Sequence, residues 1–307
     1  MRLRLFWIIV LYTLVVSMTT DVGIGRAGEN PYKWHDKALV SKVANVHDLK
    51  KSILKAVDLI GGFGKVVEKD DEIWLKPNFN TGDAPPGSSD PEFVKAVIEL
   101  LYEHEASKGI LGESSMLSLS TRKVFEETKM MRKAMEAGAE VVFFDEGKWV
   151  KVSTGEEYLK KVSLPETALN AKKLVYACTM KTHRWAKFTL SLKLAVGFMK
   201  PTERMQLHMR HLEEKIADLN LVVHPNLMIM DGRKCFISGG PTCGELRNPN
   251  VVLASGDRTA IDVEAIKTIQ NFEGSSLEAD PWNYTQIRRA VKLGIGVKTE
   301  EEYMLID

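Results

Sequence analysis

Apolar positions follow two different periods along the chain, and the period changes from one segment to the next. Within Val46–Gly61 they recur every three or four residues, which predicts an amphipathic helix. Glu72–Leu75 is a short apolar run typical of a buried strand. Asp90 and Pro91 then open a second helix, as N-cap and first helical residue, and this helix is expected to continue to about Ser107.

The same alternation continues to about residue 270. Further helices are expected at Arg122–Ala137 and Ala260–Gln270. Further strands are expected at Gly109–Gly112, Glu140–Phe144, Leu174–Cys178, Leu227–Met230 and Val251–Ser255. The pattern predicts an α/β fold with a largely parallel, mixed sheet flanked by helices. Residues 146–170 and 200–220 interrupt the alternation and are expected to be inserted or cap segments.

The start of the chain differs in composition from the rest. Two arginines precede an apolar run at residues 5–18, which as a helix would span about 21 Å, short of the roughly 30 Å of a bilayer core. A basic start and a short apolar run are typical of a signal peptide or signal anchor, which would place the protein in the envelope or on a membrane. Two alternatives stay open: translation starts at Met18, which would give a cytoplasmic protein, or the segment forms a packed helix.

This reasoning divides the chain into two parts. Residues 1–20 form a hydrophobic segment, and residues 21–307 form a single α/β domain, with a first strand expected at residues 22–25. Contact with a membrane is expected only through residues 5–18, and only if they are retained.

Charge and cysteine content exclude several classes of protein. The 42 Lys and Arg residues balance 41 Asp and Glu residues, and a net charge of +1 gives no overall attraction to nucleic acid, so no nucleic-acid partner is expected. Cys178, Cys235 and Cys243 include no C-x-x-C pair, which excludes a zinc ribbon and a thioredoxin-type motif. Three cysteines also cannot supply the four thiolates of a cubane iron–sulfur cluster within one chain.

Polar clusters directly follow two of the expected strands. Ligands of parallel sheets bind outside the carboxyl ends of the strands, so these clusters are candidate binding residues. Lys76 and Asn78, on either side of Pro77, could pair with and orient an anionic substrate, or they could form a solvated turn at the strand exit. Glu113 and Ser114 could bind a ligand, or they could cap a following helix.

A basic segment from Met180 to Pro201 contains Lys, Arg and His but no acidic residue. Basic side chains among apolar ones can form a pocket for phosphate or carboxylate groups, and Lys181 and Lys193 are the candidates here. His183 can act as an acid or a base near neutral pH. The alternative is a basic surface helix with a structural histidine.

A second polar region follows the strand expected at Leu227–Met230. Asp231 ends that strand and is a candidate catalytic or orienting carboxylate. The Gly239–Gly240 pair would let a ligand approach the backbone closely, or would simply form a turn. Neither G-x-x-x-x-G-K-[ST] nor a G-x-G-x-x-G run behind a strand occurs, so neither of the usual nucleotide-binding fingerprints is supported.

Histidines and carboxylates further along the chain are weaker candidates for a divalent metal site. His208 and His211 are spaced to share one face of a helix and could bind a metal together with His183. Asp257 and Asp262 could face the site as metal ligands or bases, or Asp257 could cap the helix that carries Asp262.

Taken in order along the chain, these clusters resemble the family known as domain of unknown function 362, over roughly residues 21–297. The residues that carry the resemblance are Lys76-Pro77-Asn78, Glu113-Ser114, Lys181, His183, Leu192-Lys193, Gly197, Asp231-Gly232, Gly239-Gly240-Pro241, Asp257, Ala260, Asp262 and Gly294-Ile295-Gly296. The resemblance implies an α/β fold, a shared polar site and an association with iron–sulfur redox systems.

The chain departs from this family pattern in two ways. Leu194 stands where the family usually has an asparagine, which removes one polar group from the candidate site. The ferredoxin-type cysteine motifs of many members are missing, so an iron–sulfur cluster is not expected in this chain alone and would have to reside on a redox partner protein.

The function that these residues favour is an enzyme acting on a small anionic substrate or cofactor. The alternatives are a non-catalytic ligand-binding or envelope-tethered protein, or an accessory to an iron–sulfur redox partner. The candidate residues are, for catalysis, Lys181, His183 and Asp231; for substrate binding, Lys76, Asn78, Glu113, Ser114, Lys193, Gly239 and Gly240; and for a metal, His208, His211, Asp257 and Asp262.

Overall fold

The computed structural model describes residues 23–25, 28–44 and 46–307. The hydrophobic segment at residues 1–20, and with it the signal, anchor and start-site alternatives, lies outside the described residues. Within the described ranges, no helix is both long and apolar enough to cross a membrane. In the strand expected at residues 22–25, the described residues form only a single bridge, between Ile24 and Val223.

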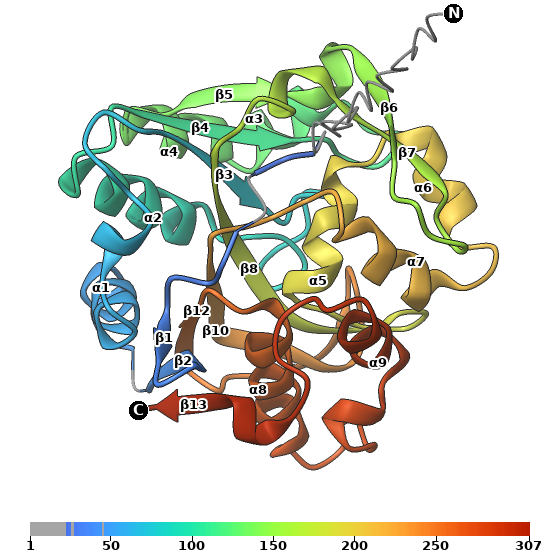
Figure 1. Cartoon of the computed structure of the whole chain (residues 1–307). Coiled ribbons are helices and arrows are strands. Elements are labelled where there is room, and N and C mark those ends of the chain that lie inside the picture. Colours follow the sequence, from blue (N-terminus) through green and yellow to red (C-terminus); the bar gives the residue numbers. More distant parts are fainter. Residues whose placement is uncertain (1–22, 26–27, 45) are drawn as a thin grey trace, which may run out of the picture.

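The described strands form one large mixed sheet and a small two-stranded one (Figure 1). The central path of the large sheet runs, in spatial order, through β1 (Lys33–Trp34), β2 (Lys37–Ala44), β12 (Val251–Ser255), β10 (Leu227–Gly239), β8 (Lys173–His183), β3 (Glu72–Pro77), β4 (Lys108–Glu113) and β5 (Glu140–Phe143). Three further strands pair with β10, β8 and β2 respectively: β11 (Gly244–Arg247), β9 (Lys187–Thr189) and β13 (Tyr303–Ile306).

The neighbouring strands β10, β8, β3, β4 and β5 are parallel, whereas β12, β2 and β1 continue the sheet antiparallel. This confirms the predicted fold class. The chain adds β4 and β5 on one side of β3, and later adds β8 on the other side. The strand order therefore reverses between β3 and β8, and the carboxyl ends of strands at such a point are the usual ligand site of an open α/β sheet.

Helices cover both faces of the large sheet (Figure 1). The helices on the first face are α1 (Leu49–Leu59), α2 (Pro91–Glu103), α3 (Thr121–Glu127) and α4 (Met130–Glu136). Those on the second face are α5 (Ser191–Leu194), α6 (Pro201–Leu207), α7 (Leu212–Leu219), α8 (Arg258–Gln270) and α9 (Thr285–Lys292).

Alternation along the strands separates the two cores. In β8, Val175 and Ala177 pack with the first group of helices, whereas Leu174 and Tyr176 pack with the second. Side chains of a strand point alternately to the two faces, so a strand buried on both sides has an unbroken apolar run. This explains why the buried strands of this chain are recognisable in the sequence as short continuous apolar segments.

Helix starts follow the predicted capping, while one helix is divided. Asp90 accepts a hydrogen bond from the Glu92 N–H at the start of α2, as predicted. The helix expected at Arg122–Ala137 is two helices, α3 and α4, because Lys129 adopts a left-handed backbone conformation with φ of 65°. Such a conformation cannot continue an α-helix, so the chain turns there.

Two strands are longer than expected, and both differences concern the candidate site. β8 does not end at Cys178 but continues to His183, so Lys181 lies on a strand. It then turns back as the antiparallel strand β9, which rules out a helix over this part of the basic segment. β10 continues past Asp231 to Gly239 through an irregular register against β8.

The two segments that interrupt the alternation lie outside the large sheet. The first contains the hairpin of β6 (Trp149–Ser153) and β7 (Lys161–Pro165), and the second contains α6 and α7. The Ser163 N–H and hydroxyl donate to the Glu203 carboxylate, at 2.8 and 2.7 Å, which ties β7 to α6. These segments cap one end of the sheet and bring α6 to the candidate site.

Candidate functional site

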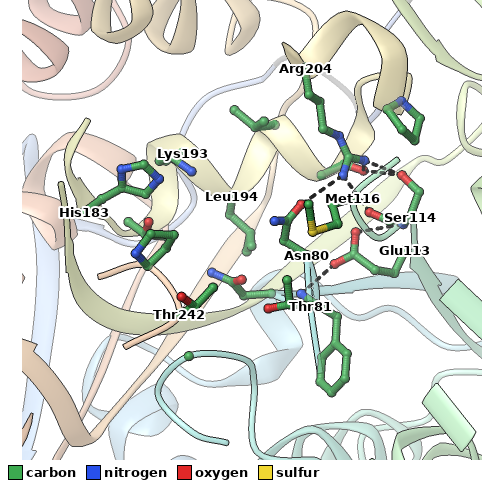
Figure 2. A pocket seen from close by; sticks show the side chains of 18 of the residues that line it. Asn80, Thr81, Glu113, Ser114, Met116, His183, Lys193, Leu194, Arg204 and Thr242 are labelled. Atoms are coloured by element: carbon green, nitrogen blue, oxygen red, sulfur yellow. Dashed lines mark hydrogen bonds between the residues drawn. The ribbon is translucent and has the colours of Figure 1, made fainter. Parts of the chain in front are cut away.

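A cavity of about 540 Å³ lies at the carboxyl ends of β3, β4 and β8. Its volume is within the range of pockets that hold small molecules. Of the ten residues predicted for catalysis or substrate binding, the following line it: Lys76, Asn78, Glu113, Ser114, Lys181, His183 and Lys193. Figure 2 shows His183 and Lys193 at one end of the cavity and Glu113, Ser114 and Arg204 at the other.

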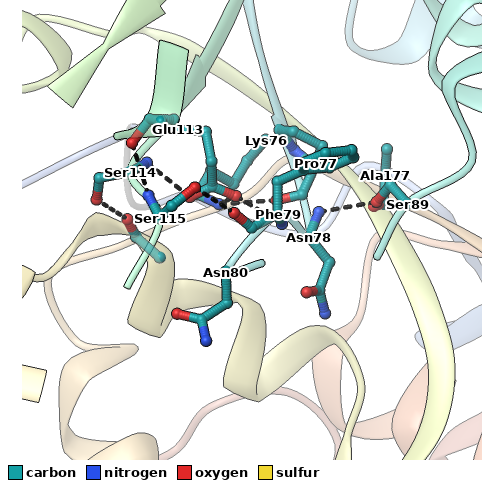
Figure 3. A network of polar contacts seen from close by, with 12 residues as sticks. Lys76, Pro77, Asn78, Phe79, Asn80, Ser89, Glu113, Ser114, Ser115 and Ala177 are labelled. Carbon is teal, nitrogen blue, oxygen red and sulfur yellow. Dashed lines mark hydrogen bonds and ion pairs between the residues drawn. The ribbon is translucent and has the colours of Figure 1, made fainter. Parts of the chain in front are cut away.

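At the Glu113 end, a buried ion pair joins β3 to β4 (Figure 3). The Lys76 ammonium lies 2.6 Å from one Glu113 carboxylate oxygen and also donates to the Pro77 carbonyl at 2.7 Å. The backbone N–H groups of Phe79 and Ser114 donate to the same carboxylate, at 2.9 and 2.8 Å. Burial lowers the pKa of Lys76 and Glu113 counteracts this. Both side chains are thus occupied by partners within the protein.

Arg204, which the sequence analysis did not single out, completes this end. Its Nε donates to the Met199 carbonyl at 2.9 Å, and its Nη atoms donate to the carbonyls of Ser114 and Gly197, each at 2.7 Å. Arg204 also bonds the Ser114 hydroxyl, so the candidate binding residue Ser114 is occupied. Burial lowers the pKa of Arg204 to about 10, a value that keeps its charge at neutral pH.

Asn78 lines the cavity directly after β3 and links the end of this strand to β8. Its backbone N–H donates to the Ser89 hydroxyl at 2.8 Å, and its side-chain Nδ2 donates to the Thr179 hydroxyl at 3.1 Å. These bonds fix the amide at the point where the strand order reverses.

The other end of the cavity holds positive charge that has few partners. Lys181 is 1% exposed, and its ammonium bonds only the Gly87 carbonyl among the residues that the structure describes. The ammonium group of Lys193, a half-buried residue, has no hydrogen-bond or ion-pair partner within the described residues. Burial, and then the charge of Lys193, lower the pKa of Lys181 to about 7. Burial, and then Arg204, lower that of Lys193 to about 8.

The His183 ring lies at the same end of the cavity, and its hydrogen bonds select one tautomer. Its Nδ1 accepts hydrogen bonds from the backbone N–H groups of Trp185 and Ala186, at 3.2 and 3.1 Å. A neutral imidazole that accepts at Nδ1 carries its proton on Nε2 and can donate there. Burial and the nearby cations, Lys193 first, lower the pKa of His183 to about 2. The ring is therefore neutral at physiological pH, and the sequence-based acid–base role for His183 does not suit it.

Asp257 and Asp262 have structural roles rather than forming a metal site. Asp257 caps α8 by accepting from the Ala260 N–H at 2.9 Å, which is the capping alternative stated above. Asp262 accepts from the N–H groups of Ser191 and Leu192, at 2.7 and 3.0 Å, although burial raises its pKa to about 7. It thereby fixes the start of α5, the short helix that carries Lys193 into the cavity.

The two histidines of the weak metal prediction are also separated. The sequence analysis expected His208 and His211 to share one face of a helix. They do not, because α6 ends at Leu207 and α7 begins only at Leu212. The His208 ring lies beside that of His183 at the cavity, with centroids 6.4 Å apart, whereas His211 contacts Tyr158. In the part of the chain that the structure describes, no group of three or more His, Cys, Asp or Glu side chains could hold a metal ion. The four predicted ligands therefore do not form one set.

Asp231 was expected to join His183 but does not line the cavity. Its carboxylate accepts from Arg233 at 2.9 and 2.7 Å, and Arg233 also reaches Asp90 at 2.7 Å. This cluster lines a neighbouring hollow beside Pro85 and Pro86. The prediction failed because β10 continues beyond Asp231, which takes the side chain away from the strand ends where the cavity lies.

Gly239 and Gly240 shape the cavity without lining it. Gly240 has a φ of 68°, and a Cβ there would come within 2.8 Å of the Thr182 carbonyl carbon. Only glycine allows this approach, which places the following residues, Pro241 and Thr242, in the cavity wall. The sequence analysis expected the two glycines to let a ligand approach the backbone. In the structure they instead position the residues that form the cavity wall.

Several cavity residues were not among the site residues predicted from the sequence. Besides Arg204 they include Trp185, Met205, Pro241 and Thr242. Trp185 lies within the basic segment, and its position between Lys181 and Lys193 could have indicated it. Arg204 and Met205 come from the cap segment 200–220, whose packing onto the sheet no local pattern reveals.

Comparison with known protein families gives a match that covers the candidate site. The family described as "Domain of unknown function (DUF362)" matches residues 73–267, more than half of the chain. The chain belongs to the DUF362 family. The matched region spans β3 to α8 and includes every residue of the two cavity ends described above, so the cavity is part of the DUF362 domain.

A relative of this DUF362 protein is found in a cyanobacterium. Thylakoid-associated protein sll1697 of Synechocystis sp. is 26% identical over 222 residues, which cover 70% of this chain and 68% of that protein. Its name states a location and no reaction.

Proposed function

We propose that the protein is an enzyme that acts on a small anionic molecule, whose phosphate or carboxylate group Lys181 and Lys193 hold in the cavity. The observation that carries the proposal is the unbalanced charge at this end of the cavity: two lysines with one carbonyl partner between them among the described residues. An ammonium group loses hydration when it is buried, and an anionic ligand is the partner that replaces it.

The cavity lining supports this assignment because it contains little negative charge, although Asp83, outside the lining, lies near enough to Lys181 to raise the pKa of that lysine. Glu113 is the only acidic residue among those that line the cavity, and Lys76 and two backbone N–H groups already occupy it. The hydroxyl of Thr189, which also lines the cavity, is buried and has no hydrogen-bond partner in the described part of the chain. A polar ligand would satisfy it.

Lys181 is the residue best suited to proton transfer. A side chain exchanges protons most efficiently when its pKa lies near the working pH. The pKa of Lys181, about 7, meets this condition, whereas that of His183, about 2, does not. We therefore assign acid–base exchange to Lys181, anion binding to Lys193, and hydrogen bonding from Nε2 to a substrate oxygen to His183.

Calorimetric titration with inorganic phosphate and with malonate tests the binding half of this proposal. The proteins to compare are the wild type, Lys181→Met, Lys193→Met and, as a control, Lys187→Met. Lys187 belongs to the same basic segment but is exposed and outside the cavity. Each cavity variant should weaken the binding of at least one anion about tenfold or more, because each removes a charged hydrogen bond. Melting temperatures should stay close to that of the wild type.

The catalytic half needs a separate readout. Purified protein is incubated with an extract of anionic metabolites, and mass spectrometry identifies compounds that the wild type consumes and Lys181→Met does not. Consumption that is absent from the variant supports an enzyme. Binding that depends on Lys193 without any consumption indicates a non-catalytic ligand-binding protein. Equal binding by the wild type and both cavity variants contradicts the proposal altogether.

A further inference from the structure

Large apolar side chains stand exposed around the mouth of the cavity. Met116, Leu117, Trp185 and Met205 all line it, and they are 41, 53, 65 and 64% exposed. They come from the loop after β4, the β8–β9 turn and α6, which are far apart in sequence. Single exposed apolar residues are common on proteins, but a group of them beside a pocket is typical of a surface that contacts an apolar ligand.

Within this apolar rim, defined as Met116, Leu117, Trp185 and Met205, Trp185 adjoins the cationic end of the cavity. The Trp185 ring lies 6.3 Å from that of His183 and 5.6 Å from that of His208, between ring centroids. Met205 follows Arg204 directly on α6, and Met116 comes two residues after Ser114, so these two rim residues lie toward the Glu113 end. A ligand held by Lys181 and Lys193 therefore has charged contacts at its inner end and apolar contacts at the mouth.

The wall between these two zones is also apolar. Leu194 follows Lys193 on α5, is 4% exposed and lines the cavity, as does Val196, which is 8% exposed. A highly hydrated anion such as a sugar phosphate would leave these side chains in contact with polar groups. A ligand with an apolar body would cover them and remove their surface from water.

We propose that the natural ligand is an amphiphilic anion: its phosphate or carboxylate head binds Lys181 and Lys193, and its apolar chain lies along Leu194 and the apolar rim. This inference rests on the proposed function and adds the chemical class of the substrate. A membrane lipid and a free acyl or alkyl anion share this chemistry, and the source is an arm of the experiment.

Chain length is the variable that tests the inference. Binding constants are measured for methyl phosphate and octyl phosphate, and for methylmalonate and octylmalonate, all below the concentrations at which they form micelles. Each buried methylene strengthens binding up to about fourfold, so two buried methylenes give roughly tenfold. The octyl ligand of at least one pair should bind at least about tenfold more tightly than its methyl counterpart.

Variants of the apolar rim test whether these side chains cause the tighter binding of the octyl ligands. Trp185→Ser combined with Met205→Ser should remove most of the chain-length gain and leave methyl-ligand binding within about twofold, because the head contacts are unchanged. Met135→Ser is the matched control, since Met135 is 60% exposed on α4 and does not line the cavity. Lys193→Met should weaken methyl and octyl ligands alike.

The source of the ligand is tested with vesicles of phosphatidylcholine, with and without phosphatidic acid. Binding that requires both phosphatidic acid and Lys193 indicates a lipid headgroup, and octyl-ligand binding without vesicle binding indicates a free amphiphile; either supports the inference. Equal affinity for methyl and octyl ligands overturns the inference and leaves the proposed function intact. Failure of all four ligands to bind overturns both.

Discussion

The two ends of the cavity both bury positive charge, but only one of them compensates it. At the Glu113 end, Lys76 has a carboxylate at 2.6 Å and Arg204 donates to four backbone carbonyls. At the opposite end, Lys181 bonds one carbonyl and Lys193 has no partner among the described residues. The ends are seen on opposite sides of the cavity in Figure 2.

This difference distinguishes the end of the cavity that belongs to the framework of the protein from the end that is proposed to bind the ligand. Removing a charge from water is costly unless partners replace the water, so a compensated pair can be part of the framework of the protein. Uncompensated lysines reduce stability, and under the proposed function an anionic ligand supplies the missing partner. Sites adapted to binding commonly have such a cost in stability.

The largest effect is expected from breaking the compensated end. Glu113→Gln should lower the free energy of unfolding by about 3–5 kcal/mol, because it leaves the Lys76 ammonium buried without a counter-charge. Urea denaturation measures this change. Glu136→Gln is the control: Glu136 is 41% exposed and pairs with surface cations, so its loss should cost less than about 1 kcal/mol. Equal effects of the two substitutions would refute the distinction.

A second substitution crowds the same end without altering its charges. A Cβ on Gly197 would lie 2.6 Å from Lys76 Cε and 2.9 Å from a Glu113 carboxylate oxygen. Gly197→Ala should therefore cost about 1–3 kcal/mol of unfolding free energy, as overpacked sites do. Gly64→Ala, where a Cβ would meet nothing within 4 Å, should leave stability nearly unchanged. Comparable melting curves for the two variants would show that the Lys76 pair can shift without loss.

A smaller effect is expected at Asp231, outside both ends. Asp231→Asn weakens the ion pair with Arg233, which is partly exposed, and should cost about 1 kcal/mol of stability. Phosphate and malonate binding should not change, because Asp231 lines the neighbouring hollow. A loss of anion binding in this variant would restore Asp231 to the site where the sequence first placed it.

A change in stability of the opposite sign is expected at the uncompensated end. The folded-state pKa values of Lys181 and Lys193, about 7 and 8, lie below the ordinary 10.5. Between about pH 7 and 10 the unfolded chain binds more protons than the folded one, so this effect makes stability rise with pH. Lys181→Met removes the cost of a buried charge and should be as stable as the wild type, or more so, at pH 6.

The comparison across pH checks that sign. The advantage of Lys181→Met over the wild type should shrink between pH 6 and pH 9, as the wild-type amine becomes neutral. Urea denaturation at the two pH values measures it. An advantage that grows with pH would mean that Lys181 is compensated in the folded protein after all.

Much of the fold and part of the site could be predicted from the sequence. Apolar runs and capping residues such as Asp90 are local signals, and they identified the sheet and several helices. Lys76 and Glu113 were found because carboxyl ends of parallel strands converge, which makes polar residues there neighbours in space. Lys181 was found because it lies in a basic segment that contains no acidic residue.

The remaining features depend on contacts that no local pattern encodes. That Lys76 pairs with Glu113, and is thus unavailable to a ligand, follows from strands β3 and β4 lying side by side. Arg204 reaches the site because the cap segment folds over the sheet end, and Asp262 fixes α5 from 70 residues away in the chain. In each case the residue type was visible in the sequence but its partner was not.

Proton uptake on anion binding tests the central claim most directly. At pH 8.5 both amines are mostly neutral in the free protein, since their pKa values are about 7 and 8, and a bound anion should draw protons onto them. Titration with inorganic phosphate in two buffers of different ionisation enthalpy measures the protons taken up. The account predicts net uptake, reduced in Lys193→Met, with affinity falling from pH 7 to pH 9. Absence of binding would contradict it. Binding that occurs without proton uptake, and whose affinity Lys193→Met leaves unchanged, would also contradict it.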